Sequence, residues 1–154
     1  MSFLLHREIS WLSRGKSLIR LFELRNDVGI FLRNNDFAMG EKLCDERWLI
    51  KLAYFGDIFL KINYLCLSLQ GKAVTVFDAT EKVQGFKKKL TYWVESIKIE
   101  SLDCFPLTKR FGEGLESDIP ENILTEFELH LLHLIDAFNS YFPNRLHENI
   151  KENV

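Results

Sequence analysis

Proline and glycine are scarce in this chain, with three prolines and eight glycines among 154 residues. The only stretch with the composition of a strand runs from Ala73 to Phe77, and no second stretch of alternating apolar and polar residues is present to pair with it. So few chain breakers, and no pair of strands, argue against sandwiches, barrels and α/β sheets. The sequence therefore predicts an all-α fold.

Cysteine is also rare and has no metal-binding spacing. Cys44, Cys66 and Cys104 are far apart, and none belongs to a CxxC or Cys/His motif. Neither a disulfide framework nor a structural zinc site is expected, and a reducing compartment, nuclear or cytoplasmic, fits this usage. His6 and Arg7 come too early for the apolar core of a secretory signal.

The chain has no long apolar stretch without charged residues. The most apolar stretch, residues 47–69, is interrupted by Lys51, Asp57 and Lys61, and charges at this density argue against a membrane span. A helix that is apolar on nearly every side is normally central in its domain. We therefore expect a domain that does not enter a membrane, with residues 47–69 at its centre.

Sequence motifs for catalysis are missing as well. No Gly-x-Ser-x-Gly, Walker or Rossmann pattern occurs, and Gly112–Gly114 lacks both the third glycine and the strand–helix setting. The carboxylate pairs Asp45/Glu46 and Glu126/Glu128 point in different directions on a helix and do not converge by themselves. We expect no catalytic residue, no cofactor and no enzymatic activity.

One helical face carries side chains that bind metals in other proteins. Glu126, His130, His133 and Asp136 follow one another at spacings of four, three and three residues. Two imidazoles and a carboxylate on one face could hold a transition metal, or these residues could form an ordinary polar surface. Because the spacing is not HExxH and no remote ligand stands out, the polar surface is favoured and no metal site is predicted.

Charge is unevenly distributed, although the net charge is only −2. Residues 1–33 hold six Lys or Arg against three Asp or Glu, residues 71–110 hold eight against five, and residues 111–154 hold two against nine. A basic face can contact phosphates, and it can equally be a solvated surface.

Apolar periodicity predicts about four main helices, near residues 13–33, 47–69, 78–98 and 118–142. Asp78 and Asp118 are the expected N-caps of the last two, and Gly71 is the expected left-handed cap that ends the second. The third helix has a regular apolar stripe, made of Val83, Phe86, Leu90, Trp93 and Ile97. We expect Lys87, Lys88 and Lys89 on its solvent side.

Basic residues and one tryptophan are the candidates for contact with nucleic acid. Trp11, with cations around it, could stack on an unpaired base, or it could pack beneath the first helix as a hydrophobic staple. The candidate contacts are Trp11, Arg14, Lys16, Arg20, Lys87, Lys88 and Lys89.

A series of motifs over residues 5–111 resembles the hAT superfamily of DNA transposases. The version it resembles is carried by domesticated vertebrate proteins with BED-type zinc fingers or general transcription factor II-I repeats. The matching motifs are Leu5-His6-x-Glu8, Trp11-Leu12-Ser13-Arg14-Gly15-Lys16, Leu21-Phe22-Glu23-Leu24-Arg25, Trp48-Leu49-x-x-Leu52-Ala53-Tyr54, Asp57-Ile58-Phe59, Asn63-x-Leu65-x-Leu67-x-Leu69-Gln70-Gly71, Phe77, Val83, Phe86, Lys87, Lys89, Leu90, Trp93 and Phe105-Pro106.

This resemblance implies a helical insertion domain, which in the family interrupts an RNase H-like nuclease core. The three metal-binding carboxylates of that core have no counterpart among the acidic residues here. The resemblance also places Trp11 beside a flipped base of the transposon end, with Ser10 where the family has arginine. It implies that the chain by itself does not cut DNA.

We therefore expect a non-catalytic helical remnant that binds protein or DNA. It would have an insertion region over residues 1–112, an acidic helix over 113–154 and a frayed tail from about residue 147. The alternatives are a DNA-binding module that uses the basic first and third helices, a protein adaptor or homo-oligomer with an exposed apolar surface, and, last, a metal-dependent hydrolase.

Overall fold

The computed structural model describes residues 14–71 and 73–143, and these residues form helices and turns without a strand. Residues 14–23 form the first helix. It is followed by α2 (Arg25–Asn34), α3 (Met39–Lys42), α4 (Glu46–Leu69), α5 (Val76–Lys98), α6 (Pro106–Gly112) and α7 (Glu121–Tyr141). The predicted all-α class is confirmed. The short α3 and α6 were not expected.

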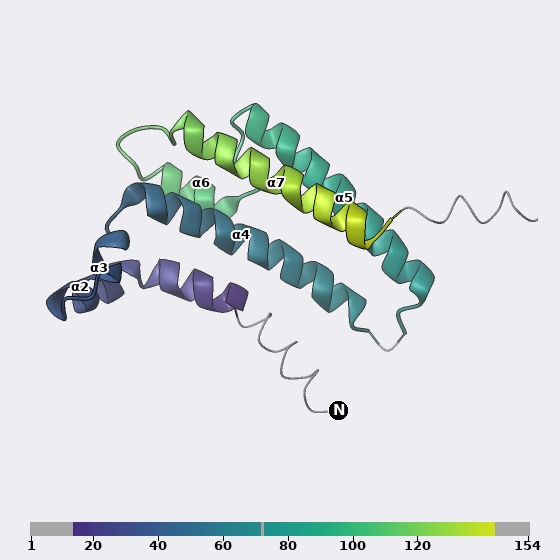
Figure 1. The fold of residues 1–154 in the computed structure, drawn as a ribbon, viewed down its shortest axis with the longest axis horizontal. Coiled ribbons are helices and arrows are strands. Elements are labelled where there is room, and N and C mark those ends of the chain that lie inside the picture. The colour runs from purple at the N-terminus through teal and green to yellow at the C-terminus, as the bar shows by residue number, and fades with distance from the viewer. Residues whose placement is uncertain (1–13, 72, 144–154) are drawn as a thin grey trace, which may run out of the picture.

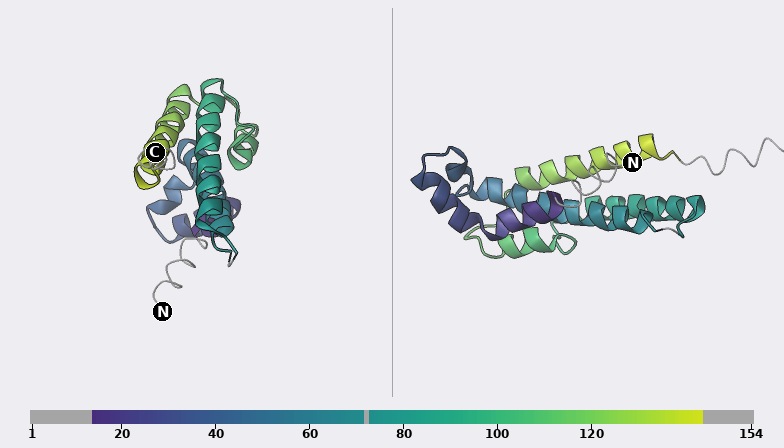
Figure 2. Two further views of the ribbon diagram at one scale, coloured as in Figure 1. Left: turned by 90° about the vertical axis from the view of Figure 1, so that its right-hand side faces the viewer. Right: turned by 90° about the horizontal axis from the view of Figure 1, so that it is seen from below.

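Helix α4 is central to the arrangement (Figure 1). The chain turns after α4 so that α5 runs back along it, and α7 then lies against α5. On another face of α4 lie the helix over residues 14–23 and the short α6. The α2–α3 pair lies beyond the N-terminal end of α4 (Figure 2).

The larger hydrophobic core joins α4, α5 and α7. The predicted α5 stripe is buried throughout, and it meets Tyr54 from α4 and Phe127 and Leu131 from α7. The Tyr54 and Phe127 rings stack with their centroids 3.9 Å apart, and Phe105 from the α5–α6 connection is fully buried beside Tyr54. Burial of these large side chains is the main force that holds the three long helices together.

A smaller core lies on the other face of α4. Its buried residues are Phe22, Leu43, Leu49, Leu52, Ala53 and Leu107. Here the helices approach closely at glycines: a Cβ at Gly15 would lie 2.5 Å from the Asn63 side chain, and one at Gly56 would lie 3.0 Å from Leu107. Gly15 therefore allows residues 14–23 to lie close to α4, and Gly56 does the same for α6.

Asp57 connects α4 to the start of α6. Its carboxylate, 2% exposed, accepts hydrogen bonds from the Leu107 and Thr108 amides at 3.1 and 2.9 Å and from Thr108 Oγ1 at 2.8 Å. Because Phe105, the N-cap of α6, supplies no side-chain bond, Asp57 caps that helix from a different part of the chain. Burial raises the pKa of Asp57, while these hydrogen bonds and Lys61 counter part of the rise.

Several predicted helix ends are wrong. The first segment is divided by a turn at Leu24, and α5 begins earlier than predicted, with Thr75 as N-cap and Asp78 as its reciprocal partner in a capping box. Pro120, not Asp118, precedes α7, and it offers no side-chain cap. No described glycine has a positive φ, so Gly71 is not a left-handed cap.

Among the described helices, α4 alone is long and apolar enough to cross a membrane, with a mean hydropathy of 1.3 in its most apolar window. The same composition suits a helix that is packed on two faces, which is the place of α4 in this fold. Its charged residues are accommodated by the fold: Asp57 caps α6, and Lys51 pairs with Glu126 of α7 at 2.5 Å.

Candidate interaction groove between α4 and α5

The predicted nucleic-acid contacts do not form one surface. Trp11 lies outside the described residues. Arg14, Lys16 and Arg20 are exposed on the helix over residues 14–23, and Arg20 pairs with Glu23 at 3.2 Å. This helix belongs to the smaller core, whereas α5, with its lysines, belongs to the larger one. The two basic groups therefore lie on helices that pack against different faces of α4.

The prediction for Lys87 is wrong. Lys88 and Lys89 are exposed, but Lys87 is only 8% exposed and its ammonium donates to the Phe142 carbonyl at the end of α7. The last turn of α7 has no basic residue of its own, so Lys87 satisfies the free carbonyl there. We therefore remove Lys87 from the candidate contacts.

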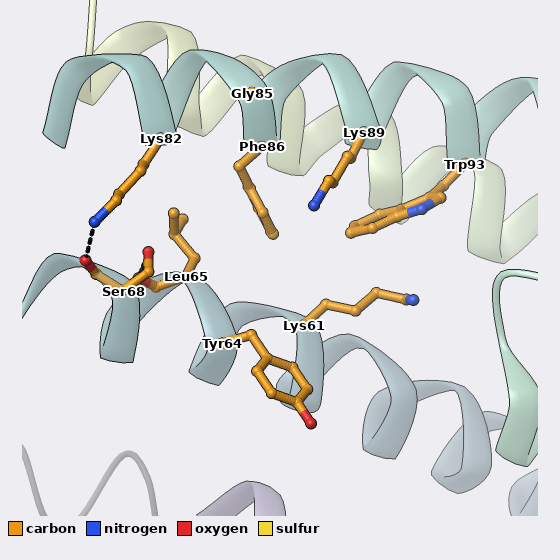
Figure 3. A pocket seen from close by; sticks show the side chains of 9 residues that line it. All are labelled: Lys61, Tyr64, Leu65, Ser68, Lys82, Gly85, Phe86, Lys89 and Trp93. Carbon is orange, nitrogen blue, oxygen red and sulfur yellow. Dashed lines mark hydrogen bonds between the residues drawn. The ribbon is translucent and has the colours of Figure 1, made fainter. Parts of the chain in front are cut away.

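A groove of about 500 Å³ lies between the C-terminal half of α4 and the middle part of α5 (Figure 3). Its lining combines three lysines with an apolar floor and contains no carboxylate. The lining residues are Lys61, Tyr64, Leu65, Ser68, Lys82, Gly85, Phe86, Lys89 and Trp93. We call this set the α4–α5 groove.

The three lysines of the groove differ in their partners. Lys82 donates to the Ser68 carbonyl at 2.6 Å and so caps the C-terminal end of α4, which has no basic residue in its last turn. Lys61 Nζ lies 4.6 Å from the centroid of the Trp93 ring. Lys89 extends into the space between the helices and forms no hydrogen bond or ion pair with any described residue (Figure 3).

Lys61 is partly shielded from water, and burial lowers its pKa. The carboxylate of Asp57 raises that pKa in part, and nearby Lys89 lowers it further. Two like charges that share a partly enclosed space, with no acid in its lining, make the potential in the groove positive. The groove can therefore attract an anionic group.

Gly85 leaves the α5 side of the groove open. A Cβ added there would meet no atom within 4 Å, so internal packing does not require glycine at this position. Glycine inside a helix destabilises it by about 0.5–1 kcal/mol relative to alanine. Glycine at position 85 therefore lowers the stability of α5, and no contact among the described residues requires it.

The possible metal-binding face has other contacts. Nδ1 of His130 lies 2.9 Å from the Tyr54 hydroxyl, and Glu126 pairs with Lys51. Burial lowers the pKa of His130, and the neighbouring His133 lowers it further. In residues 14–71 and 73–143, no group of three His, Cys, Asp or Glu residues is placed to hold a metal ion.

Sequence reasoning missed Lys61, Lys82 and Gly85. Lys61 was considered only as a charge that interrupts an apolar helix, although a cation in such a helix must reach solvent or a counter-charge. A glycine in the middle of a regular amphipathic helix was a second available signal. These residues come together only because α4 and α5 pack against each other, and neither sequence feature predicts that packing.

Comparison with known proteins identifies relatives of this chain. Residues 2–98 match the FAM200/GTF2IRD2 helical domain. Over 136 residues the chain is 32% identical to General transcription factor II-I repeat domain-containing protein 2 of Bos taurus. The match covers 84% of this chain and 14% of that relative, so the chain spans about one seventh of the relative's length. No solved structure matches the chain.

Proposed function

The chain belongs to the FAM200/GTF2IRD2 helical-domain family, as the motifs of residues 5–111 predicted, and on this premise we propose that it is a non-catalytic binding module. It would be the helical insertion portion of a domesticated hAT-type transposase, in the nucleus or cytoplasm. The observation that carries the proposal is the α4–α5 groove, in which lysines border an open space above an apolar floor. Such a surface is suited to recognition rather than to bond cleavage.

The roles of the acidic side chains support the non-catalytic part of this proposal. Asp45 caps α4, Asp57 caps α6, and Asp78 completes the capping box of α5. Metal-dependent nucleases need carboxylates that converge on a shared ion. These three carboxylates instead accept hydrogen bonds from the backbone at three separate helix starts.

A nicking assay tests the absence of catalysis. The full chain would be incubated with supercoiled plasmid and Mg²⁺ or Mn²⁺, with heat-inactivated protein as the control. We expect no conversion to the nicked form. Conversion that a chelator abolishes, and that follows the protein through successive purification steps, would overturn the proposal.

DNA binding is the second candidate, because Arg14, Lys16, Lys88 and Lys89 are all exposed. It predicts binding to a DNA duplex that weakens as salt rises and weakens again when these four residues are changed to Ala. The variant Lys87→Ala is not informative about contacts, because the loss of a buried helix cap would perturb the fold. No binding at low salt would eliminate this candidate.

An exposed apolar surface on the α2–α3 pair favours a protein partner or a second copy of the chain. Ile30, Phe31, Phe37 and Met39 are each more than half exposed. Apolar side chains gathered in this way are typical of interaction sites. Sedimentation velocity over a range of concentrations tests self-association: Phe31→Glu should shift an oligomer toward monomer, and a wild-type chain that is monomeric throughout would exclude the second copy.

A further inference from the structure

We propose that the α4–α5 groove is a docking site for an acidic amphipathic helix of a partner protein. This inference rests on the proposed binding function and gives the chemistry of its partner. Lys61 and Lys89 supply positive charge without a carboxylate in the lining, and Leu65, Phe86 and Trp93 supply an apolar floor. A helix with acidic and apolar faces complements both features.

The spacing of the groove lysines along α5 suits a helical partner. Lys82 and Lys89 lie seven residues apart on α5, which is about 10 Å or two turns at 1.5 Å per residue. Carboxylates on a partner helix recur at similar distances when acidic residues are three, four or seven positions apart. The groove is formed by two long antiparallel helices, so an added helix would extend the packing that α7 already makes with α5.

Gly85 gives the partner close access to α5. Because a Cβ there would meet no atom within 4 Å, the space above the backbone is open to an incoming side chain. A docked apolar residue at this point would account for glycine where alanine would make α5 more stable.

Nucleic acid fits the same groove less well. Trp93 is 6% exposed, and Lys61 lies over its ring, so neither it nor the buried Phe86 offers a free face for a base. Tyr64 is 72% exposed, but its ring points away from α5 (Figure 3).

The test measures binding of the full chain to labelled probes by fluorescence anisotropy. The main probe is a synthetic helical peptide with Leu at alternating three- and four-residue spacing and Glu on its other face. A matched peptide replaces each Glu with Gln, and a single-stranded oligonucleotide is the third probe. We expect saturable binding of the Glu peptide, binding of the Gln peptide weaker by about tenfold or more, and no preference for the oligonucleotide.

Variants on one helix locate the site. Lys89→Glu reverses a charge in the groove, and Lys88→Glu makes the same change on an exposed neighbour outside it. Gly85→Leu fills the opening without any change of charge. We expect Lys89→Glu and Gly85→Leu each to weaken the binding affinity for the Glu peptide by about tenfold. Lys88→Glu should bind it with an affinity close to that of the wild type. The circular dichroism spectra of all three variants should match that of the wild type.

Equal effects of Lys88→Glu and Lys89→Glu would overturn the inference, as would full binding by Gly85→Leu. Preference for the oligonucleotide, or no peptide binding by the wild-type chain, would also overturn it. The outcome of the nicking assay is independent of all these binding results. If the chain neither nicks DNA nor binds the peptide, the proposed acidic helical partner is refuted and the proposal of a non-catalytic module is retained.

Discussion

The two faces of α4 are packed in different ways. On one face, two helices of more than twenty residues meet α4 through large rings and aliphatic side chains, with Tyr54, Phe105 and Phe127 at the centre. On the other face, shorter helices pack close to α4 at two glycines, Gly15 of the first helix, which faces the Asn63 side chain, and Gly56 of α4, which faces Leu107. Buried apolar area stabilises both faces, and on the second face the packing also depends on the absence of a side chain at these two glycines.

The difference shows how a single helix can serve two kinds of core. A face packed through large side chains needs only a regular apolar stripe. A face packed through close backbone approach needs small residues at the crossing points and polar groups that satisfy the ends of short helices. Asp57 meets the second need, because it supplies the cap that α6 lacks.

The largest expected effect comes from breaking this connection. Asp57→Ala leaves two buried amides and the Thr108 hydroxyl without their acceptor, and we expect it to lower the free energy of unfolding by about 3 kcal/mol. Urea denaturation measures the loss. Hydrogen exchange should show faster exchange at Leu107 and Thr108 than at the α5 amides.

Thr108→Val is the matched control for Asp57→Ala. It removes one of the three hydrogen bonds to Asp57 with little change of shape, so a loss of about 1 kcal/mol is expected. If Asp57→Ala were as stable as the wild type, the cap from α4 would have no energetic role.

Two alanine substitutions compare glycine in the two regions. At Gly40 in α3, a Cβ would lie 2.8 Å from the Arg33 amide nitrogen, so Gly40→Ala should destabilise the chain by about 1–3 kcal/mol. At Gly85 in α5, a Cβ meets open space, so Gly85→Ala should stabilise it by about 0.5–1 kcal/mol. Opposite signs in thermal unfolding are the expected result, and a shared sign would contradict it.

The smallest expected effect is the response of the larger core to pH. Because burial lowers the pKa of His130, the folded chain favours its neutral form. The stabilising contribution is complete above the ordinary value of 6.5 and is lost as pH falls from there through the lowered pKa. Unfolding measured between about pH 7 and 5 should therefore show falling stability.

The variant His130→Asn keeps an acceptor for Tyr54 and removes the titration, so it should flatten the pH profile. His133→Asn, at an exposed position of the same helix, is the control and should leave most of the slope in place. Identical slopes in the wild type and His130→Asn would exclude His130 as the source.

Regular periodicity made the larger core predictable. Val83, Phe86, Leu90, Trp93 and Ile97 are buried as the spacing predicted, because long amphipathic helices bury one face regardless of detail. The error at Lys87 was avoidable, since this residue lies four positions after Val83 and three before Leu90 and therefore shares their face.

The smaller core and the groove were harder to predict. The four-residue α3 is too short to show periodicity, and α6 depends on an acceptor fifty residues away in sequence. The groove depends on where two helices cross, which sets Lys61 of α4 opposite Lys89 of α5. These features arise from tertiary packing and leave only isolated signals in the sequence, such as a charge or a glycine within an amphipathic helix.

Both hydrophobic cores include side chains of α4 (Glu46–Leu69), so neither core is complete without this helix. A chain cut within this helix would give two fragments, each with apolar side chains of a core exposed to solvent. A gene fusion that moves this fold into another protein should therefore carry both cores, since we expect either core alone to be unstable.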